Sequence, residues 1–106
     1  MSSFLPGTMT MLILRTLQLG PLHGYAIGQA IRESSRNRLE IEDGSLYPAL
    51  TRMVAKGWLR GRWDQSETNR KARIYRITPS GRKASDRLTA EFLQLVKGIN
   101  EVLKSS

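Results

Sequence analysis

Apolar residues between Ser45 and Lys56 recur at the spacing of an α-helix and share one face; they are Leu46, Leu50, Met53 and Val54. This pattern predicts a short helix over residues 45–56. Ser45 is expected to cap its first turn, because a serine hydroxyl can accept a free backbone N–H there. Pro48 would then lie in the first turn, where its missing N–H has no helical partner to lose. Gly57 is expected to end the helix.

A more apolar helix is expected near the start of the chain. Thr8 can cap it, and apolar residues lie on nearly all of its sides as far as Leu19. A helix with this pattern is buried on most sides. It either packs wholly inside its own chain or, as we expect for so small a domain, also meets a second chain. The glycine-proline pair at 20–21 ends it.

A second amphipathic helix is expected to begin at His23 or Gly24 and to run to about Ser35. Residues 36–38 form a polar turn, and residues 39–41 alternate between apolar and polar, which predicts a short strand. The second helix, this turn and the helix at 45–56 then form a helix-turn-helix with a strand between its helices.

After Gly57 the hydrophobic period changes from 3.6 to 2, which predicts strands. Residues 58–63 form the first strand, with Leu59 and Trp63 on its inner face. Residues 72–77 form its partner, with Tyr75 and Ile77 pointing inward. The polar segment 66–71 joins the two strands as a hairpin loop. This hairpin is the wing of a winged helix.

The last helix is expected to begin at Pro79, after Thr78 as its N-cap. It carries a long apolar stripe made of Leu88, Phe92, Leu95, Ile99, Val102 and Leu103. The predicted fold is therefore mainly α with a small β-wing, a winged helix-turn-helix with an added C-terminal dimerisation helix. Residues 1–78 form the DNA-binding unit and residues 79–106 the dimerisation helix, within one compact domain of 106 residues.

Two apolar helices in so short a chain would expose more apolar surface than a monomer tolerates. We therefore expect a twofold homodimer in which the last helix packs on its symmetry mate and on the partner's first helix. The residues expected in this interface are Leu12, Leu88, Phe92, Leu95, Ile99 and Val102.

The charge is concentrated in one part of the chain. The formal net charge is +8, and residues 52–87 contain eleven basic but only three acidic side chains, whereas residues 1–51 contain four of each. The basic segment covers the helix and the wing that a winged helix offers to DNA. No cysteine is present, which excludes disulfides and thiolate metal sites. No apolar run reaches the length of a membrane span.

The outward face of the helix at 45–56 suits duplex DNA. Arg52 can contact guanine O6 and N7, Pro48 and Thr51 can touch thymine methyl groups, and Ser45 and Tyr47 can donate to phosphates. Further cations for the phosphates or the minor groove are Lys56 at the end of this helix and Arg70, Lys71 and Arg73 on the wing.

Four segments resemble the PadR family of transcriptional regulators: residues 5–8, 19–27, 43–50 and 75–81, which include "HGY", "GSLYPAL" and "YRITPSG". The resemblance implies a cytoplasmic bacterial repressor or regulator that dimerises through its C-terminal helix and binds operator DNA. We expect no cofactor. The resemblance also implies that His23 and Tyr25 lie near the DNA backbone. Some family members respond to phenolic acids or planar aromatic drugs, so a small aromatic effector is a candidate partner. The chain resembles the short subfamily, and Phe92 is the one aromatic residue on its last helix.

Other functions fit the residues less well. A basic winged helix that binds RNA or the ribosome would share the charge but would not need two apolar dimerisation surfaces. An adaptor for other proteins would bind nucleic acid weakly and without salt dependence. An enzyme has little to build on, because the single histidine has no Ser, Cys or Asp partner at a recognisable spacing. Membrane binding would require a basic amphipathic helix, whereas the basic residues here lie mostly on the predicted strands and their hairpin.

Overall fold

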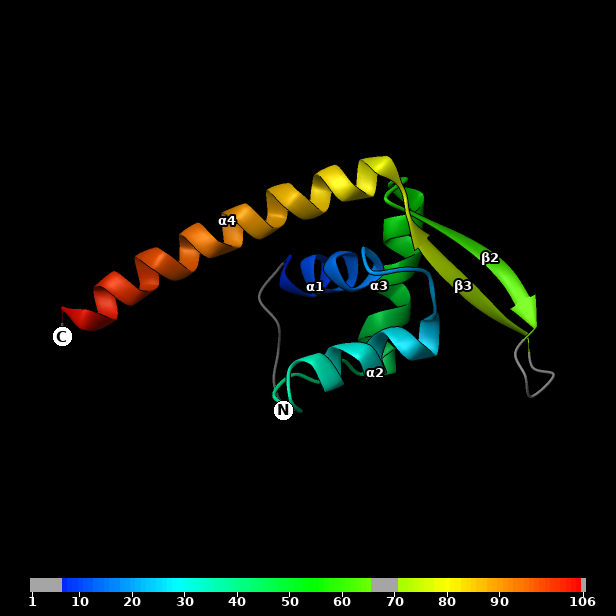
Figure 1. Cartoon of the computed structure of the whole chain (residues 1–106), viewed down its shortest axis with the longest axis horizontal. Coiled ribbons are helices and arrows are strands. Elements are labelled where there is room, and N and C mark those ends of the chain that lie inside the picture. The colour runs from blue at the N-terminus through cyan, green and yellow to red at the C-terminus, as the bar shows by residue number, and fades with distance from the viewer. Residues whose placement is uncertain (1–6, 66–70, 106) are drawn as a thin grey trace.

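The computed structural model describes residues 7–65 and 71–105, which form four helices and three strands (Figure 1). In chain order the elements are α1 (Thr8–Leu17), β1 (Leu22–His23), α2 (Gly24–Ser34), α3 (Asp43–Ala55), β2 (Leu59–Gln65), β3 (Lys71–Ile77) and α4 (Pro79–Lys104). This order confirms the predicted winged helix-turn-helix with an added C-terminal helix. None of the described helices is both long and apolar enough to cross a membrane.

The three strands form one antiparallel sheet in the order β1-β3-β2. In β2 and β3, Leu59 pairs with Ile77, and β1 adds Leu22 opposite Tyr75. The short strand predicted at residues 39–41 was wrong, because that segment has no neighbouring strand to pair with. It crosses as a loop instead: Ile41 is buried, and the Leu39 N–H donates to the Ser35 hydroxyl.

The core lies between α1, α2, α3 and the inner face of the sheet. Its largest fully buried apolar side chains are Ile13, Leu14, Leu17, Ile27, Leu46, Leu50 and Leu59. Three of these lie on α1, so much of the apolar surface of that helix is covered by its own chain. The helix starts after Gly7, whose φ of 85° is left-handed, so Thr8 is its first residue and not its cap.

The last helix is tied to the end of α3 through Thr78. The Thr78 hydroxyl accepts from the Gly81 N–H at 3.0 Å, which confirms the predicted cap, and donates to the Gly57 carbonyl oxygen at 2.7 Å. Gly81 has to be small, since a methyl group there would collide with the Trp58 carbonyl oxygen and lie 2.8 Å from Ile77 Cγ1. From this anchor α4 passes over α1 and extends far beyond the core (Figure 1).

Candidate nucleic-acid interface

The face of α3 turned away from the core carries the side chains predicted to contact DNA. Its inner positions Leu46, Ala49, Leu50 and Met53 are buried. The exposed residues are Ser45, Tyr47, Pro48, Thr51 and Arg52, with Lys56 directly after the helix. Between Asp43 and Asp64 the chain has four basic and no acidic side chains. Of these four, Arg52 and Lys56 belong to this face and lie toward its C-terminal end, so that end attracts anions.

The start of α3 differs from the expectation. The helix begins at Asp43, and its N-cap is Glu42, which makes no side-chain capping bond, so the prediction of Ser45 as the cap was wrong. The Asp43 carboxylate in the first turn interacts favourably with the positive end of the helix dipole. Pro48 is consequently the sixth helical residue, and the hydrogen bond it would have donated to the Gly44 carbonyl is missing. Gly44 is exposed, so water can satisfy that carbonyl.

Tyr47 on α3 packs against the start of α2. A methyl group added at Gly24 would lie 2.9 Å from Tyr47 Cε1 and 3.4 Å from Tyr75 Cε2, so only glycine leaves room for both rings. Burial raises the pKa of the Tyr47 hydroxyl above its ordinary 10.0, and the negative charge of Asp43 and the nearby Tyr75 add to the rise. The phenol therefore stays protonated at neutral pH and can donate a hydrogen bond.

His23 and Tyr25 lie where α2 begins, beside the wing. Their rings stack with centroids 5.3 Å apart, and Tyr25 is exposed. His23 Nε2 is buried and lies 3.9 Å from Asp64 Oδ2, which is too long for a hydrogen bond. Among the described residues no three His, Asp or Glu side chains gather to hold a metal ion. The exposed Tyr25 ring, stacked on His23, is suited to contact with a surface.

The outer face of the wing places like charges opposite each other. Arg60 on β2 pairs in register with Arg76 on β3, and both are exposed. Arg62 lies on the same face, two residues further along β2. Like charges directly opposite in a sheet destabilise it. An anion beside the wing would relieve this repulsion.

The inner face of the wing carries a stack around Arg73. The Arg73 guanidinium lies 5.7 Å from the centroid of the Trp63 ring and 5.4 Å from that of Tyr75. Trp63 shares the inner face with Leu59, as predicted, but lies beyond the core and is 68% exposed. Lys56 is also engaged with an aromatic ring, since its Nζ lies 4.6 Å above Trp58.

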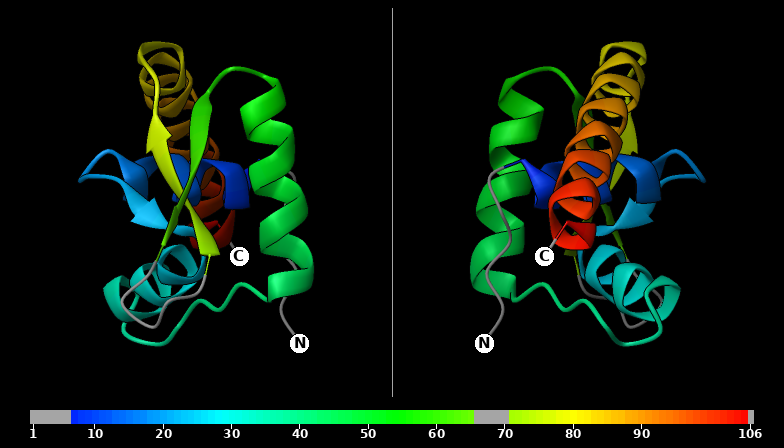
Figure 2. Two further views of the ribbon diagram at one scale, coloured as in Figure 1. Left: turned by 90° about the vertical axis from the view of Figure 1, so that its right-hand side faces the viewer. Right: turned by 90° about the vertical axis from the view of Figure 1, so that its left-hand side faces the viewer.

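Two of the predicted wing cations cannot be located. Arg70 lies outside the described residues, and Lys71 begins β3 with a side chain that is not described. The structure brings the remaining predicted residues of α2, α3 and the wing onto neighbouring elements (Figure 2, left). Sequence reasoning missed Arg60, Arg76 and Trp63. Pairing the two strands residue by residue would have placed the two arginines opposite each other. Because β2 extends well beyond Leu59, its one core residue, its length would have placed Trp63 outside the core.

A second exposed surface runs along the far half of α4. Its large apolar side chains Leu95, Ile99, Val102 and Leu103 are 45–67% exposed, and with Gln94 and Gly98 they line a shallow groove. Leu12 and Leu88, predicted in the same dimer interface, are half-buried and pack against the core of their own chain. Phe92 is also half-buried. The apolar stripe thus has an inner part, which α1 covers, and an outer part that no other described residue covers.

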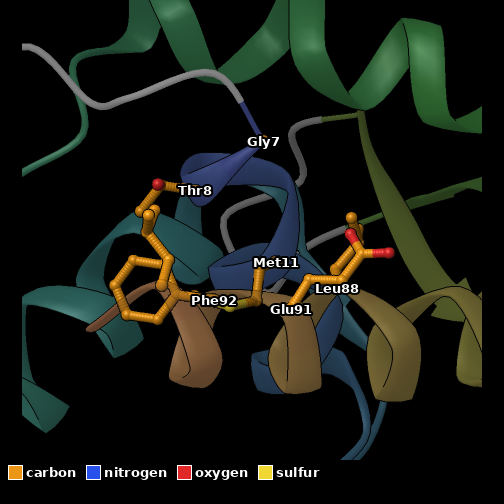
Figure 3. A pocket seen from close by; sticks show the side chains of 7 residues that line it. Gly7, Thr8, Met11, Leu88, Glu91 and Phe92 are labelled. Carbon is orange, nitrogen blue, oxygen red and sulfur yellow. The ribbon is translucent and has the colours of Figure 1, made fainter. Parts of the chain in front are cut away.

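A small cavity lies where these two parts meet. It has a volume of about 190 Å³ between the start of α1 and the middle of α4 (Figure 3). Its lining residues are Gly7, Thr8, Met11, Leu88, Glu91, Phe92 and Leu95. The Glu91 carboxylate, which pairs with Arg87 at 3.6 Å, is the one acidic group of this lining. The cavity is suited to a small, mainly apolar molecule.

Comparison with known proteins identifies the type of fold and its family. The family model described as "Transcriptional regulator PadR-like family" matches residues 13–87. A 37.1 kDa protein in transposon Tn4556 of Streptomyces fradiae is 44% identical over 77 residues; the match spans 73% of this chain but only 21% of that protein.

Two solved structures illustrate the likeness in space. A transcriptional regulator from Clostridium thermocellum is 30% identical, with a TM-score of 0.81, and the match covers 90% of this chain and 92% of that one. Bacillus subtilis PadR, solved in complex with operator DNA, has the same fold at 23% identity, with a TM-score of 0.70 over 79% of this chain and 46% of that one.

Proposed function

Because the chain belongs to the PadR-like family of transcriptional regulators, we propose that it represses transcription by binding a palindromic operator as a homodimer. In this proposal α3 enters the major groove, and the wing contacts phosphates or the minor groove. Members of the family regulate transcription and are not enzymes. The operator complex of Bacillus subtilis PadR supports DNA as the partner.

The observation that carries the proposal is that α3 and the adjoining wing both expose cations. Arg52 projects from the exposed face of the helix, and Arg60 and Arg76 face each other on the adjoining hairpin. Their mutual repulsion is unfavourable in the free protein. A DNA phosphate near the pair would turn this repulsion into attraction, and the release of counterions would add affinity.

We assign the predicted contacts as follows. Arg52 reads a guanine, and Pro48 and Thr51 touch thymine methyl groups. The Thr51 hydroxyl already donates to the Tyr47 carbonyl oxygen at 3.1 Å. Ser45, Tyr47, His23 and Tyr25 contact the backbone, and Lys56, Arg70, Lys71 and Arg73 supply positive charge.

The dimer is proposed to form through the outer apolar stripe of α4. Leu95, Ile99 and Val102 are at least 45% exposed, which is unfavourable for large aliphatic side chains. Packing two such stripes against each other about a twofold axis would bury both. Because Thr78 ties α4 to the end of α3, the dimer would hold the two recognition helices at a fixed separation of about one turn of DNA.

A small aromatic effector is proposed to act at the cavity between α1 and α4. The volume of about 190 Å³ is large enough for one aromatic ring, since apolar cavities of about 150 Å³ bind benzene. A ligand there would regulate DNA binding if it favoured one separation of the recognition helices over another. Glu91 in the lining favours neutral or cationic rings over acids.

Selection of preferred duplexes from a random DNA pool tests the proposed function. We expect a palindrome with half-sites about one helical turn apart, protected by two chains in a footprint. Repeating the selection with a panel of monocyclic phenols and amines tests the effector. Equal binding to all duplexes and to structured RNA would instead support the alternative of a general basic winged-helix module.

A further inference from the structure

Trp63 is a large aromatic side chain in an unusual position. It lies on β2, beyond the core, and is 68% exposed. A tryptophan with so much apolar surface in water is unfavourable. The wing around it is basic, with Arg60, Arg62 and Arg76 exposed on the opposite face.

Arg73 packs against one face of the Trp63 ring. Arg73 lies directly opposite Trp63 in the register of the hairpin, and its guanidinium is stacked between the Trp63 and Tyr75 rings. Arg73 Nε is buried and has no hydrogen-bond partner among the residues that the structure describes. The guanidinium occupies the space above Gly61, where a methyl group would lie 2.7 Å from Arg73 Cζ. The sequence thus leaves room at position 61 for this stack.

The stack continues to the recognition helix. Tyr75, the inner member, is buried and lies with Tyr47 over Gly24. Trp63, Arg73, Tyr75 and Tyr47 therefore form one row from the wing to α3. Trp63 lies at the outer end of this row, and Tyr47, at its other end, lies on the exposed face of α3.

We propose that Trp63 is a DNA-contacting residue, whose exposed ring packs against a deoxyribose of the operator beside the wing, and that Arg73 is the positioning residue that holds the ring there. This inference rests on the proposed function. The occupant is duplex DNA because the apolar ring lies against one cation, Arg73, on a wing whose other face carries three more arginines, and a DNA strand presents apolar sugars flanked by phosphates. Sugar contacts carry no sequence information, so Trp63 contributes affinity without base preference.

The test is an affinity measurement on the selected operator and on an unrelated duplex. Trp63→Ala is expected to weaken binding to both by roughly tenfold, because it removes a large aromatic contact. Leu19→Ala is the matched control: it also removes an exposed apolar side chain, 92% exposed and outside the wing, and should leave both affinities unchanged. Arg73→Lys keeps the charge but loses the planar stack, so it should also weaken binding.

A fluorescence measurement separates contact from a merely structural role. In the Trp58→Phe variant Trp63 is the one remaining tryptophan. Adding operator duplex should shield it from acrylamide quenching, and Arg73→Lys in that background should make it more accessible in the free protein. If the protein binds operator while Trp63 stays as accessible as before, or if Trp63→Ala binds with unchanged affinity, this inference is overturned. A wild-type chain that binds no duplex overturns the proposed function as well.

Discussion

At the scale of single residues, Arg52 and Tyr47 lie on the same face of α3 but are suited to two different kinds of DNA contact. Arg52 is exposed, so its guanidinium is free to make a bidentate contact with a base. The Tyr47 ring packs over Gly24 beside Tyr75, which limits the positions of its hydroxyl. A donor confined in this way is suited to a phosphate, whose place does not depend on the sequence, whereas the extended cation is suited to reading guanine.

Arg52→Ala is predicted to cost about 1–3 kcal/mol of operator binding and to relax base preference at one position in each half-site. Selection on the variant measures the preference, and titration measures the affinity. Arg32→Ala, which removes the same charge from the exposed side of α2, is the control and should keep the preference. An Arg52→Ala protein that selects the wild-type sequence would remove Arg52 from the set of reading residues.

Gly24→Ala is predicted to weaken operator binding by about 1 kcal/mol, because its methyl group, 2.9 Å from Tyr47 Cε1, would push the phenol out of position. Gly28→Ala is the matched control on the same helix, where the added methyl meets Leu46 Cδ2 at an ordinary 3.7 Å. That control should bind normally and raise the free energy of unfolding by up to about 1 kcal/mol. Equal affinities for the two variants would contradict the proposed role of Tyr47.

At the scale of elements, the wing adds charge to a reading helix that is itself only modestly basic. Its arginine pair, Arg60 and Arg76, lies on the outer face, and its aromatic-arginine stack lies on the inner face. The hairpin is thus basic on one side and aromatic on the other. Both features are suited to the sugar-phosphate backbone, which α3 in the proposed complex would contact only at its edges.

Removing two wing cations should weaken binding to all duplexes alike. For Arg70→Ala combined with Lys71→Ala, we expect the slope of log K against log salt to flatten by about 0.9 for each phosphate that the variant no longer neutralises. The control is Lys97→Ala combined with Lys104→Ala, which removes the same charge from α4, whose far end lies away from the wing (Figure 1). A slope that does not change would mean that these two residues do not touch phosphates.

At the scale of the whole molecule, α4 is the element that would link the proposed dimer to DNA binding. The molecule measures 56 × 29 × 21 Å, and its long dimension comes from this helix, which leaves the core after the cavity (Figure 1). Two hydrogen-bonded anchors join it to the rest: Thr78 to the Gly57 carbonyl, and the buried Ser85 hydroxyl, which accepts from Gln18 at 2.7 Å. A change in how α4 packs would therefore be transmitted to the recognition helix.

Leu95→Asp combined with Ile99→Asp should convert the protein to monomers and lower operator affinity by orders of magnitude, because each buried carboxylate would lack a partner in the interface. Sedimentation and footprinting measure the two effects. Leu93→Asp is the control: Leu93 is 57% exposed but lies two residues from Leu95, on the opposite face of the helix, so this variant should remain dimeric. A wild-type chain that sediments as a monomer at micromolar concentration and protects one half-site would contradict the dimer.

Much of the fold could be predicted because its signals are local. The periodicity of residues 45–56 and the Thr78-Pro79 pair act within one or two turns of chain, and the structure confirms a helix at each place. The change to period 2 after Gly57 likewise predicted the wing. These features depend on side-chain spacing and capping, which a sequence displays directly.

Only the tertiary structure decided the features that depend on partners distant in sequence. A strand needs a neighbour, so residues 22–23 joined the sheet beside β3, whereas residues 39–41, despite their alternation, had no strand beside them. Trp63 fits the inner-face pattern, yet the core ends before it, and its exposure follows from where the helices stop covering the sheet. Cross-strand register places Arg60 opposite Arg76 and Arg73 above Gly61. Register decides this because it brings together residues that are far apart in the sequence.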